Sequence, residues 1–158
     1  MTWLGQLVVG PPGSGKTTYV RAAREALRLA GRRVVVVNLD PGNEAAWGAD
    51  EGEGEEEGEV VDMAELVTVR GAQRELGLGP NGATVFCMEY VEARVEWLEE
   101  RLRAVGVGNG KDNDDAPPYF LIDMPGQVEL VTHHESARRI VERLSKSLSL
   151  RLCAVHLV

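Results

Sequence analysis

The 158-residue sequence has few of the features that mark secreted, membrane-spanning or metal-binding proteins. Its two cysteines, Cys87 and Cys153, stand far apart and outside any C-x-x-C pattern. We therefore expect two reduced core thiols, and neither a disulfide nor a metal site built on cysteine. The first residues lack the basic and apolar runs of a secretory signal, and no run approaches the ~20 apolar residues that cross a bilayer. These absences predict a cytoplasmic protein that does not associate with membranes.

Positive charge is scarce as well: the chain has 17 basic and 25 acidic residues, and its formal net charge is -8. Seven of the acidic residues lie between positions 50 and 59, and removing these seven charges leaves -1. The charge of the remaining chain gives no support to direct nucleic-acid binding. Residues 48–59 mix glycine with carboxylates and cannot bury enough apolar surface to offset the entropy lost on ordering. We predict a flexible acidic insert there; the alternative is a docking segment for a basic partner.

Short apolar runs alternate with segments of helical composition along the chain. We expect strands at 4–9, 34–39, 119–122 and 150–158, helices at 16–30, 62–76, 89–105 and 135–147, and a polar loop insert at 106–118. Apolar strands that alternate with helices indicate a parallel sheet with helices on both faces, which binds ligands at the carboxyl ends of its strands. The sequence thus predicts a single α/β domain over residues 1–158.

Residues 10–17, Gly-Pro-Pro-Gly-Ser-Gly-Lys-Thr, fit the P-loop pattern G-x-x-x-x-G-K-[ST] between a predicted strand and a predicted helix. Glycines let backbone N–H groups turn toward phosphate oxygens, and the helix directs its positive end at the same charge. Lys16 would reach the outer phosphates, and the Thr17 hydroxyl would ligate Mg²⁺. The alternative is a glycine-rich turn with an incidental lysine. We predict a P-loop NTPase whose nucleotide-binding residues are Gly13, Ser14, Gly15, Lys16, Thr17 and Thr18.

Acidic residues end two of the predicted strands on the side of the P-loop. Asp123 follows an apolar strand, as a residue that holds Mg²⁺ through water must. Asp40 follows another strand, where it would polarise the attacking water or join the Mg²⁺ shell; its alternative is a turn cap. Gln127 is a candidate to orient the water, and its alternative is a surface amide ahead of a helix. The pattern thus predicts Asp40 and Gln127 as catalytic residues, and Thr17, Asp40 and Asp123 as metal residues.

Several segments together resemble the GPN-loop GTPases, and most closely the second eukaryotic paralogue of that family. The most diagnostic segment is Leu78-Gly79-Pro80-Asn81-Gly82, which lies between the Asp40 segment and Cys87-Met88-Glu89-Tyr90 in the order of the family. The other matching segments are 10–19, 37–43, 123–129, 132–134 and 152–158. The resemblance covers nearly all of the chain except the two polar inserts.

The resemblance implies a GTPase that uses Mg²⁺ and works as a dimer, either of identical chains or with a paralogue. It implies that the loop of Gly79, Pro80 and Asn81 reaches the nucleotide of the other subunit, where Asn81 acts in trans on the terminal phosphate or the attacking water. It also implies a role in assembly and nuclear import of RNA polymerase II. Its partners would then be polymerase subunits or assembly factors, and the protein would shuttle from the cytoplasm to the nucleus.

One part of the family pattern is missing. The family reads guanine with a Thr/Asn-Lys-x-Asp segment, and neither Lys111 nor Lys146 lies in such a segment. The family is also longer than this chain, so we expect a C-terminally truncated domain, either a fragment or the product of a truncated gene model. Two other interpretations stay open because a phosphate site alone does not choose the acceptor. One is a P-loop kinase that uses ATP, and the other is an inactive fragment that acts only by binding proteins.

Overall fold

The structure is a computed structural model that describes residues 1–43, 47, 59–107, 116–126 and 135–158. The strands are β1 (Trp3–Val9), β2 (Val34–Asn38), β3 (Glu59–Asp62), β4 (Tyr119–Asp123) and β5 (Leu150–His156). The helices are α1 (Lys16–Leu29), α2 (Val69–Leu76), α3 (Pro80–Ala93), α4 (Val95–Val107) and α6 (Ser136–Ser147), with a 3-10 turn η1 (Met63–Glu65). Within the described residues the strands form one parallel sheet in the order β3-β2-β4-β1-β5. The predicted α/β fold with a parallel sheet is confirmed.

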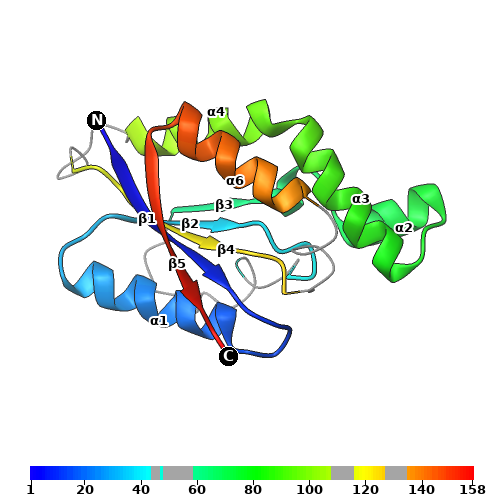
Figure 1. The fold of residues 1–158 in the computed structure, drawn as a ribbon, viewed down its shortest axis with the longest axis horizontal. Coiled ribbons are helices and arrows are strands. Elements are labelled where there is room, and N and C mark those ends of the chain that lie inside the picture. Colours follow the sequence, from blue (N-terminus) through cyan, green and yellow to red (C-terminus); the bar gives the residue numbers. More distant parts are fainter. Residues whose placement is uncertain (44–46, 48–58, 108–115, 127–134) are drawn as a thin grey trace, which may run out of the picture.

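Helices cover both faces of this sheet, with α1 on one face and α3, α4 and α6 on the other (Figure 1). Strand β2 shows why helices are needed on both faces, because all of its residues are buried. Val34 and Val36 belong to the core cluster that includes α1, whereas Val35 and Val37 belong to the cluster that includes the other helices. Successive side chains of a strand point to opposite faces, so an unbroken run of valines requires cover on both sides.

Strand β4 lies between β1 and β2 and fixes where these strands end relative to one another. Asp123, the last residue of β4, is level with Val8 of β1 and with Asn38 of β2. The backbone of the chain stays hydrogen-bonded to β4 one residue beyond the end of β2, because Leu39 N donates a hydrogen bond to Asp123 O at 2.9 Å. The parallel register therefore brings the carboxyl ends of three strands to one edge, where the P-loop leaves β1.

The sequence did not reveal β3, which pairs with β2 at the border of the sheet. This strand begins at Glu59, so Glu59 is not part of the predicted acidic insert at 48–59, and residues 48–58 lie outside the described residues. Glu59 accepts hydrogen bonds from Arg33 Nε at 2.9 Å and Nη2 at 2.8 Å, which ties β3 to the start of β2. A strand of four residues beside a carboxylate-rich stretch has too few apolar positions for recognition by periodicity.

The predicted helix at 89–105 is two helices, and the first begins nine residues earlier than expected. Gly79 has an extended backbone, and Pro80 takes the first position of α3, where its missing N–H costs no hydrogen bond. The expected loop at 79–81 is therefore largely the first turn of a helix. The helix ends at Arg94, whose φ of -121° lies outside the helical range, and α4 follows at once.

Two other boundaries differ from the sequence prediction. The helix expected at 62–76 is interrupted after η1, because the Thr68 hydroxyl accepts a hydrogen bond from Gly71 N at 3.0 Å and caps a separate helix, α2. Helix α4 extends to Val107, so the first two residues of the polar insert predicted at 106–118 are helical. Residues 108–115 of that insert lie outside the described residues.

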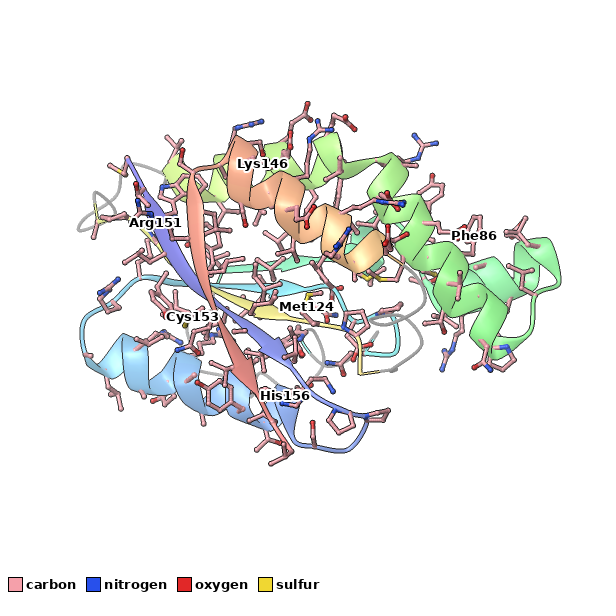
Figure 2. All side chains as sticks on the ribbon, viewed as in Figure 1. Phe86, Met124, Lys146, Arg151, Cys153 and His156 are labelled. Atoms are coloured by element: carbon pink, nitrogen blue, oxygen red, sulfur yellow. The ribbon has the colours of Figure 1, made fainter. Side chains whose placement is uncertain are left out.

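The two cysteines lie in different surroundings. Cys87 of α3 is buried in the core, whereas Cys153 of β5 is exposed (Figure 2), and no disulfide joins them. The expectation of a core thiol is thus confirmed for Cys87 and wrong for Cys153, which lies on β5, one of the two edge strands of the described sheet. None of the helices that the structure describes is long and apolar enough to cross a bilayer.

Gly5 of β1 lies where the sheet leaves no space for a side chain. A Cβ there would be 2.5 Å from the Phe120 carbonyl oxygen and 3.0 Å from Leu152 Cδ2. We expect Gly5→Ala to lower the free energy of unfolding by about 2 kcal/mol, because the backbone of β4 must shift. The matched control is Gly82→Ala in α3, where the nearest atoms are 3.9 Å away and helix propensity favours alanine by about 1 kcal/mol. Urea unfolding measures the change in the free energy of unfolding for both variants. Equal changes in Gly5→Ala and Gly82→Ala would contradict the close packing at Gly5.

Candidate nucleotide-binding site

The P-loop bends around the start of α1 and borders a pocket of about 380 Å³. Gly13 and Gly15 have φ angles of 74° and 89°, a left-handed conformation that glycine adopts without strain. Ser14 N donates a hydrogen bond to Pro11 O at 3.2 Å and closes the turn. Lys16 is only 7% exposed, and its Nζ donates to the same carbonyl oxygen at 3.2 Å. The loop thus holds its ammonium group inside the curve that would receive phosphates.

The pocket brings together most of the residues that the sequence predicts for the site. It is lined by the P-loop, by the segment after β2 and by the segment after β4. The lining residues are Pro12, Gly13, Gly15, Lys16, Thr17, Thr18, Asp40, Gly42, Asn43 and Gly126. Two predicted residues lie behind this lining: the Ser14 hydroxyl is buried, and Asp123 is fully buried next to Thr17.

Thr17 and Asp123 are joined by a hydrogen bond, in which Thr17 Oγ1 donates to Asp123 Oδ2 at 3.2 Å. Burial, together with the negative charge of Asp40, raises the pKa of the Asp123 carboxyl to about 6. The Thr17 hydrogen bond and the positive charge of Lys16 oppose this rise in pKa without cancelling it. Ionised Asp123 is therefore unfavourable at this buried position, and a cation next to it would stabilise the charge.

Asp40 borders the same pocket in the turn after β2. Its Oδ1 accepts a hydrogen bond from Gly42 N at 2.9 Å, and its own N–H donates to Asn38 Oδ1 at 3.1 Å. Burial raises the pKa of Asp40, although the Gly42 N–H, the Lys16 charge and the Gly126 N–H each lower it. Asp40 thus caps its turn and also lines the pocket, so the two interpretations of this residue are compatible.

Gly126 allows the P-loop to lie close to the segment after β4. A Cβ at this position would be 2.6 Å from Lys16 Nζ and 3.4 Å from Pro12 Cα. A side chain here would push the ammonium group out of its place in the pocket. The absence of a side chain at Gly126 is therefore part of the geometry that positions Lys16.

The oxygen atoms behind the pocket lining fit Mg²⁺, which prefers oxygen ligands. Asp123 Oδ1 is buried and has no hydrogen-bond donor among the described residues, and a buried oxygen of this kind calls for a partner. Thr17 Oγ1 lies next to this carboxylate and borders the pocket. No group of three or more His, Cys, Asp or Glu residues gathers in the described part of the chain. Water and phosphate oxygens would complete the shell of an Mg²⁺ ion held here.

Asn43 and Asn38 belong to this site, although the sequence analysis gave neither of them a role. Asn43 Nδ2 donates hydrogen bonds to Thr17 Oγ1 at 2.9 Å and to Asp123 Oδ2 at 3.4 Å. Asn38, fully buried at the end of β2, donates from Nδ2 to Asn43 O at 3.3 Å. A polar residue that ends a run of four valines was an available signal for Asn38, whereas Asn43 is recognised only once the fold brings it to Thr17.

Two predicted catalytic residues are not brought to the pocket. Asn81 is exposed in the first turn of α3, together with Gly79 and Pro80, and it is not among the residues that line the pocket. Helices α2 and α3 extend beyond the carboxyl ends of β2, β3 and β4 (Figure 1). The role of Asn81 in trans stays a prediction. Gln127 lies outside the described residues.

The raised pKa of Asp123 predicts that its charge destabilises the nucleotide-free chain. Because the carboxyl binds its proton more tightly in the folded state, the cost is full above about pH 6 and disappears near pH 4. We expect Asp123→Asn to raise the free energy of unfolding at pH 7.5 by about 1–3 kcal/mol, since an amide oxygen still accepts the Thr17 hydrogen bond. Urea unfolding with EDTA at pH 7.5 and pH 4.5 measures the gain, which should shrink at the lower pH. A pH-independent gain would contradict this origin.

The chain is similar to several known proteins. A family model described as "Conserved hypothetical ATP binding protein" matches residues 8–158. The GPN-loop GTPase 2 of Danio rerio is 49% identical over 154 residues, which are 98% of this chain and 43% of that protein. The GPN-loop GTPase QQT1 of Arabidopsis thaliana is 45% identical over 98% of this chain and 46% of its own length. The GPN-loop GTPase 3 of Kluyveromyces lactis is 35% identical over 100% of this chain and 51% of its own length.

The solved structures include a similar protein, a GTPase from Pyrococcus abyssi in its apo form. It has a TM-score of 0.59 and 33% sequence identity, and the match covers 89% of this chain and 48% of that chain. The chain thus spans about half the length of the relatives it matches. The identities confirm the resemblance to the second paralogue. Because the family model covers nearly the whole chain and the relatives bear the family name, the chain belongs to the GPN-loop GTPase family.

Proposed function

We propose that the chain binds GTP together with Mg²⁺ and hydrolyses the terminal phosphate. The observation that carries the proposal is one pocket in which Lys16, Thr17 and Asp40 line the space beside the P-loop, with Asp123 hydrogen-bonded to Thr17. The names of the relatives favour GTP over ATP, since both the curated relatives and the similar crystal structure are called GTPases.

Each residue of the pocket has a separate task in this proposal. The P-loop N–H groups and Lys16 hold the phosphates and stabilise the negative charge that develops on them. Thr17 and Asp123 would hold Mg²⁺, which would supply positive charge that neutralises the phosphates. Asp40 is ready to accept a hydrogen bond from the attacking water, because its carboxylate borders the pocket and its raised pKa makes it a stronger base.

The finer parts of the proposal concern a second subunit and the cellular role. We propose a dimer, with an identical chain or with a paralogue, in which Asn81 reaches the nucleotide of the other subunit. Its exposure at the start of α3 supports this, because an amide needed in trans has to be accessible.

By the family resemblance we further propose a role in assembly and nuclear import of RNA polymerase II. The partners would be polymerase subunits or assembly factors, and the protein would move between cytoplasm and nucleus.

Nucleotide preference tests the first part of the proposal. We expect a fluorescent GTP analogue to bind the chain in the presence of Mg²⁺. In a full-length form that carries the guanine-reading Thr/Asn-Lys-x-Asp segment, we expect GTP to displace the analogue at least tenfold more effectively than ATP. Lys16→Ala should weaken this binding by more than tenfold, because it removes the cation beside the phosphates. Displacement by ATP as effective as that by GTP, with phosphate transfer to an added acceptor, would favour the P-loop kinase. Failure to bind either nucleotide by a folded chain would favour a fragment that acts only by binding proteins.

A mixing experiment tests the action of Asn81 in trans. Asn81→Ala should slow hydrolysis by about 10-fold or more with little change in nucleotide affinity, because the residue would act on the reaction and not on the bound ground state. Equal amounts of Asn81→Ala and Lys16→Ala chains should regain activity, since a mixed dimer contains one site with both residues intact. A mixture no more active than its components would contradict action in trans. An equal loss of affinity in the two variants would contradict a catalytic role.

A further inference from the structure

The Asn43 side chain contacts both Thr17 and Asp123. Its Nδ2 lies 2.9 Å from Thr17 Oγ1 and 3.4 Å from Asp123 Oδ2, and Thr17 Oγ1 lies 3.2 Å from the same carboxylate oxygen. The three groups form a closed triangle of hydrogen bonds. Thr17 comes from α1, Asp123 from β4 and Asn43 from the segment after β2, so the triangle joins three separate parts of the fold.

The backbone of Asn43 is held at both ends. Its N–H donates to Asp40 O at 3.1 Å, and its carbonyl oxygen accepts a hydrogen bond from Asn38 Nδ2 at 3.3 Å. Asn38 Nδ2 also donates to Asp62 Oδ1 at 3.1 Å, which ties the turn to the end of β3. Because Asn38 is fully buried, this support is sheltered from water, and the Asn43 amide is presented to the metal residues in a fixed direction.

The hydrogen-bonding capacity of the triangle leaves room for a metal ion. The Thr17 hydroxyl has one proton, which it gives to Asp123, and two lone pairs, of which Asn43 uses one. The second lone pair remains for a cation. Asp123 Oδ1 has no donor among the described residues, so it too remains for the ion or its water. The Asn43 contacts are therefore compatible with Mg²⁺ and orient the two groups that would hold it.

We propose that Asn43 is a positioning residue for Mg²⁺, which fixes the Thr17 hydroxyl and the Asp123 carboxylate in the arrangement that the ion requires. This inference rests on the proposed function, because the ion enters with the nucleotide. Partners that hydrogen-bond metal-binding groups set the direction of their lone pairs, and their loss typically weakens metal affinity by about 10- to 100-fold. Asn43 thus makes nucleotide binding depend more strongly on Mg²⁺, without contributing to the grip on the phosphates themselves.

The dissociation constant of a fluorescent GDP analogue, measured in EDTA and in millimolar Mg²⁺, separates these two effects. The informative quantity is the dissociation constant in EDTA divided by the one in Mg²⁺. We expect Asn43→Ala to reduce this ratio about tenfold, while the dissociation constant in EDTA stays within about twofold of that of the original chain. Asn43→Leu, which keeps a similar branched shape without the amide, should give the same reduction. Tyr19→Phe is the matched control, because it removes one hydrogen bond of α1, from the Tyr19 hydroxyl to Gln6 Oε1 at 2.9 Å, outside the pocket. Its ratio should equal that of the original chain.

Three outcomes would overturn the inference. An unchanged ratio in Asn43→Ala would show that Thr17 and Asp123 need no support from the amide. An equal loss of affinity with and without Mg²⁺ would assign Asn43 to the nucleotide or to folding. A normal ratio in Asn43→Leu would show that the shape of the side chain matters and its N–H does not. Failure of the proposed function is distinguishable from all three, because it would already show in the original chain as an absence of nucleotide binding.

Discussion

The placement of β4 between β1 and β2 is the constraint on which the rest of the site depends. Parallel pairing on both sides makes Asp123 level with Val8 and Asn38, so the ends of three strands share one edge of the sheet. The P-loop continues from β1 and the Asp40 turn continues from β2, and both therefore meet Asp123. A shift of β4 by one residue would turn Asp123 to the other face of the sheet and separate it from Thr17. The packed faces of the sheet prevent this shift, since Phe120 and Ile122 are buried on one side and Leu121 on the other.

The pocket is built around two carboxyl groups that are costly to ionise. Burial raises the pKa of both Asp40 and Asp123, and the two negative charges act on each other. Lys16 is the nearby positive charge that partly compensates them. A cation bound next to these carboxyl groups would offset the cost of their ionisation, and its binding would then be coupled to the stability of the fold.

The segment after β2 connects this pocket to β3, at the edge of the sheet. Asn43 contacts Thr17 and Asp123, Asn38 holds Asn43, and Asp62 accepts hydrogen bonds from both Asn38 Nδ2 and Ala64 N. Ala64 lies in η1, directly before the helices that carry the Gly79-Pro80-Asn81 sequence. Thr17 and Asp123 are thus linked by hydrogen bonds between buried or half-buried polar groups to η1, which precedes α2 and α3 in the chain.

The sequence by itself determined the elements whose signal is local. The P-loop, the valine run of β2, the apolar strand before Asp123 and helix α1 could all be predicted, because spacing and composition within a few residues encode them. Strand β3 could not, because its four residues are stabilised by pairing with β2 and by the Arg33–Glu59 ion pair. The break at Arg94 and the role of Asn43 were likewise decided by the tertiary structure. Asn43 contacts Thr17 and Asp123 across 26 and 80 residues of sequence, and only the folded sheet brings such distant groups within hydrogen-bond distance.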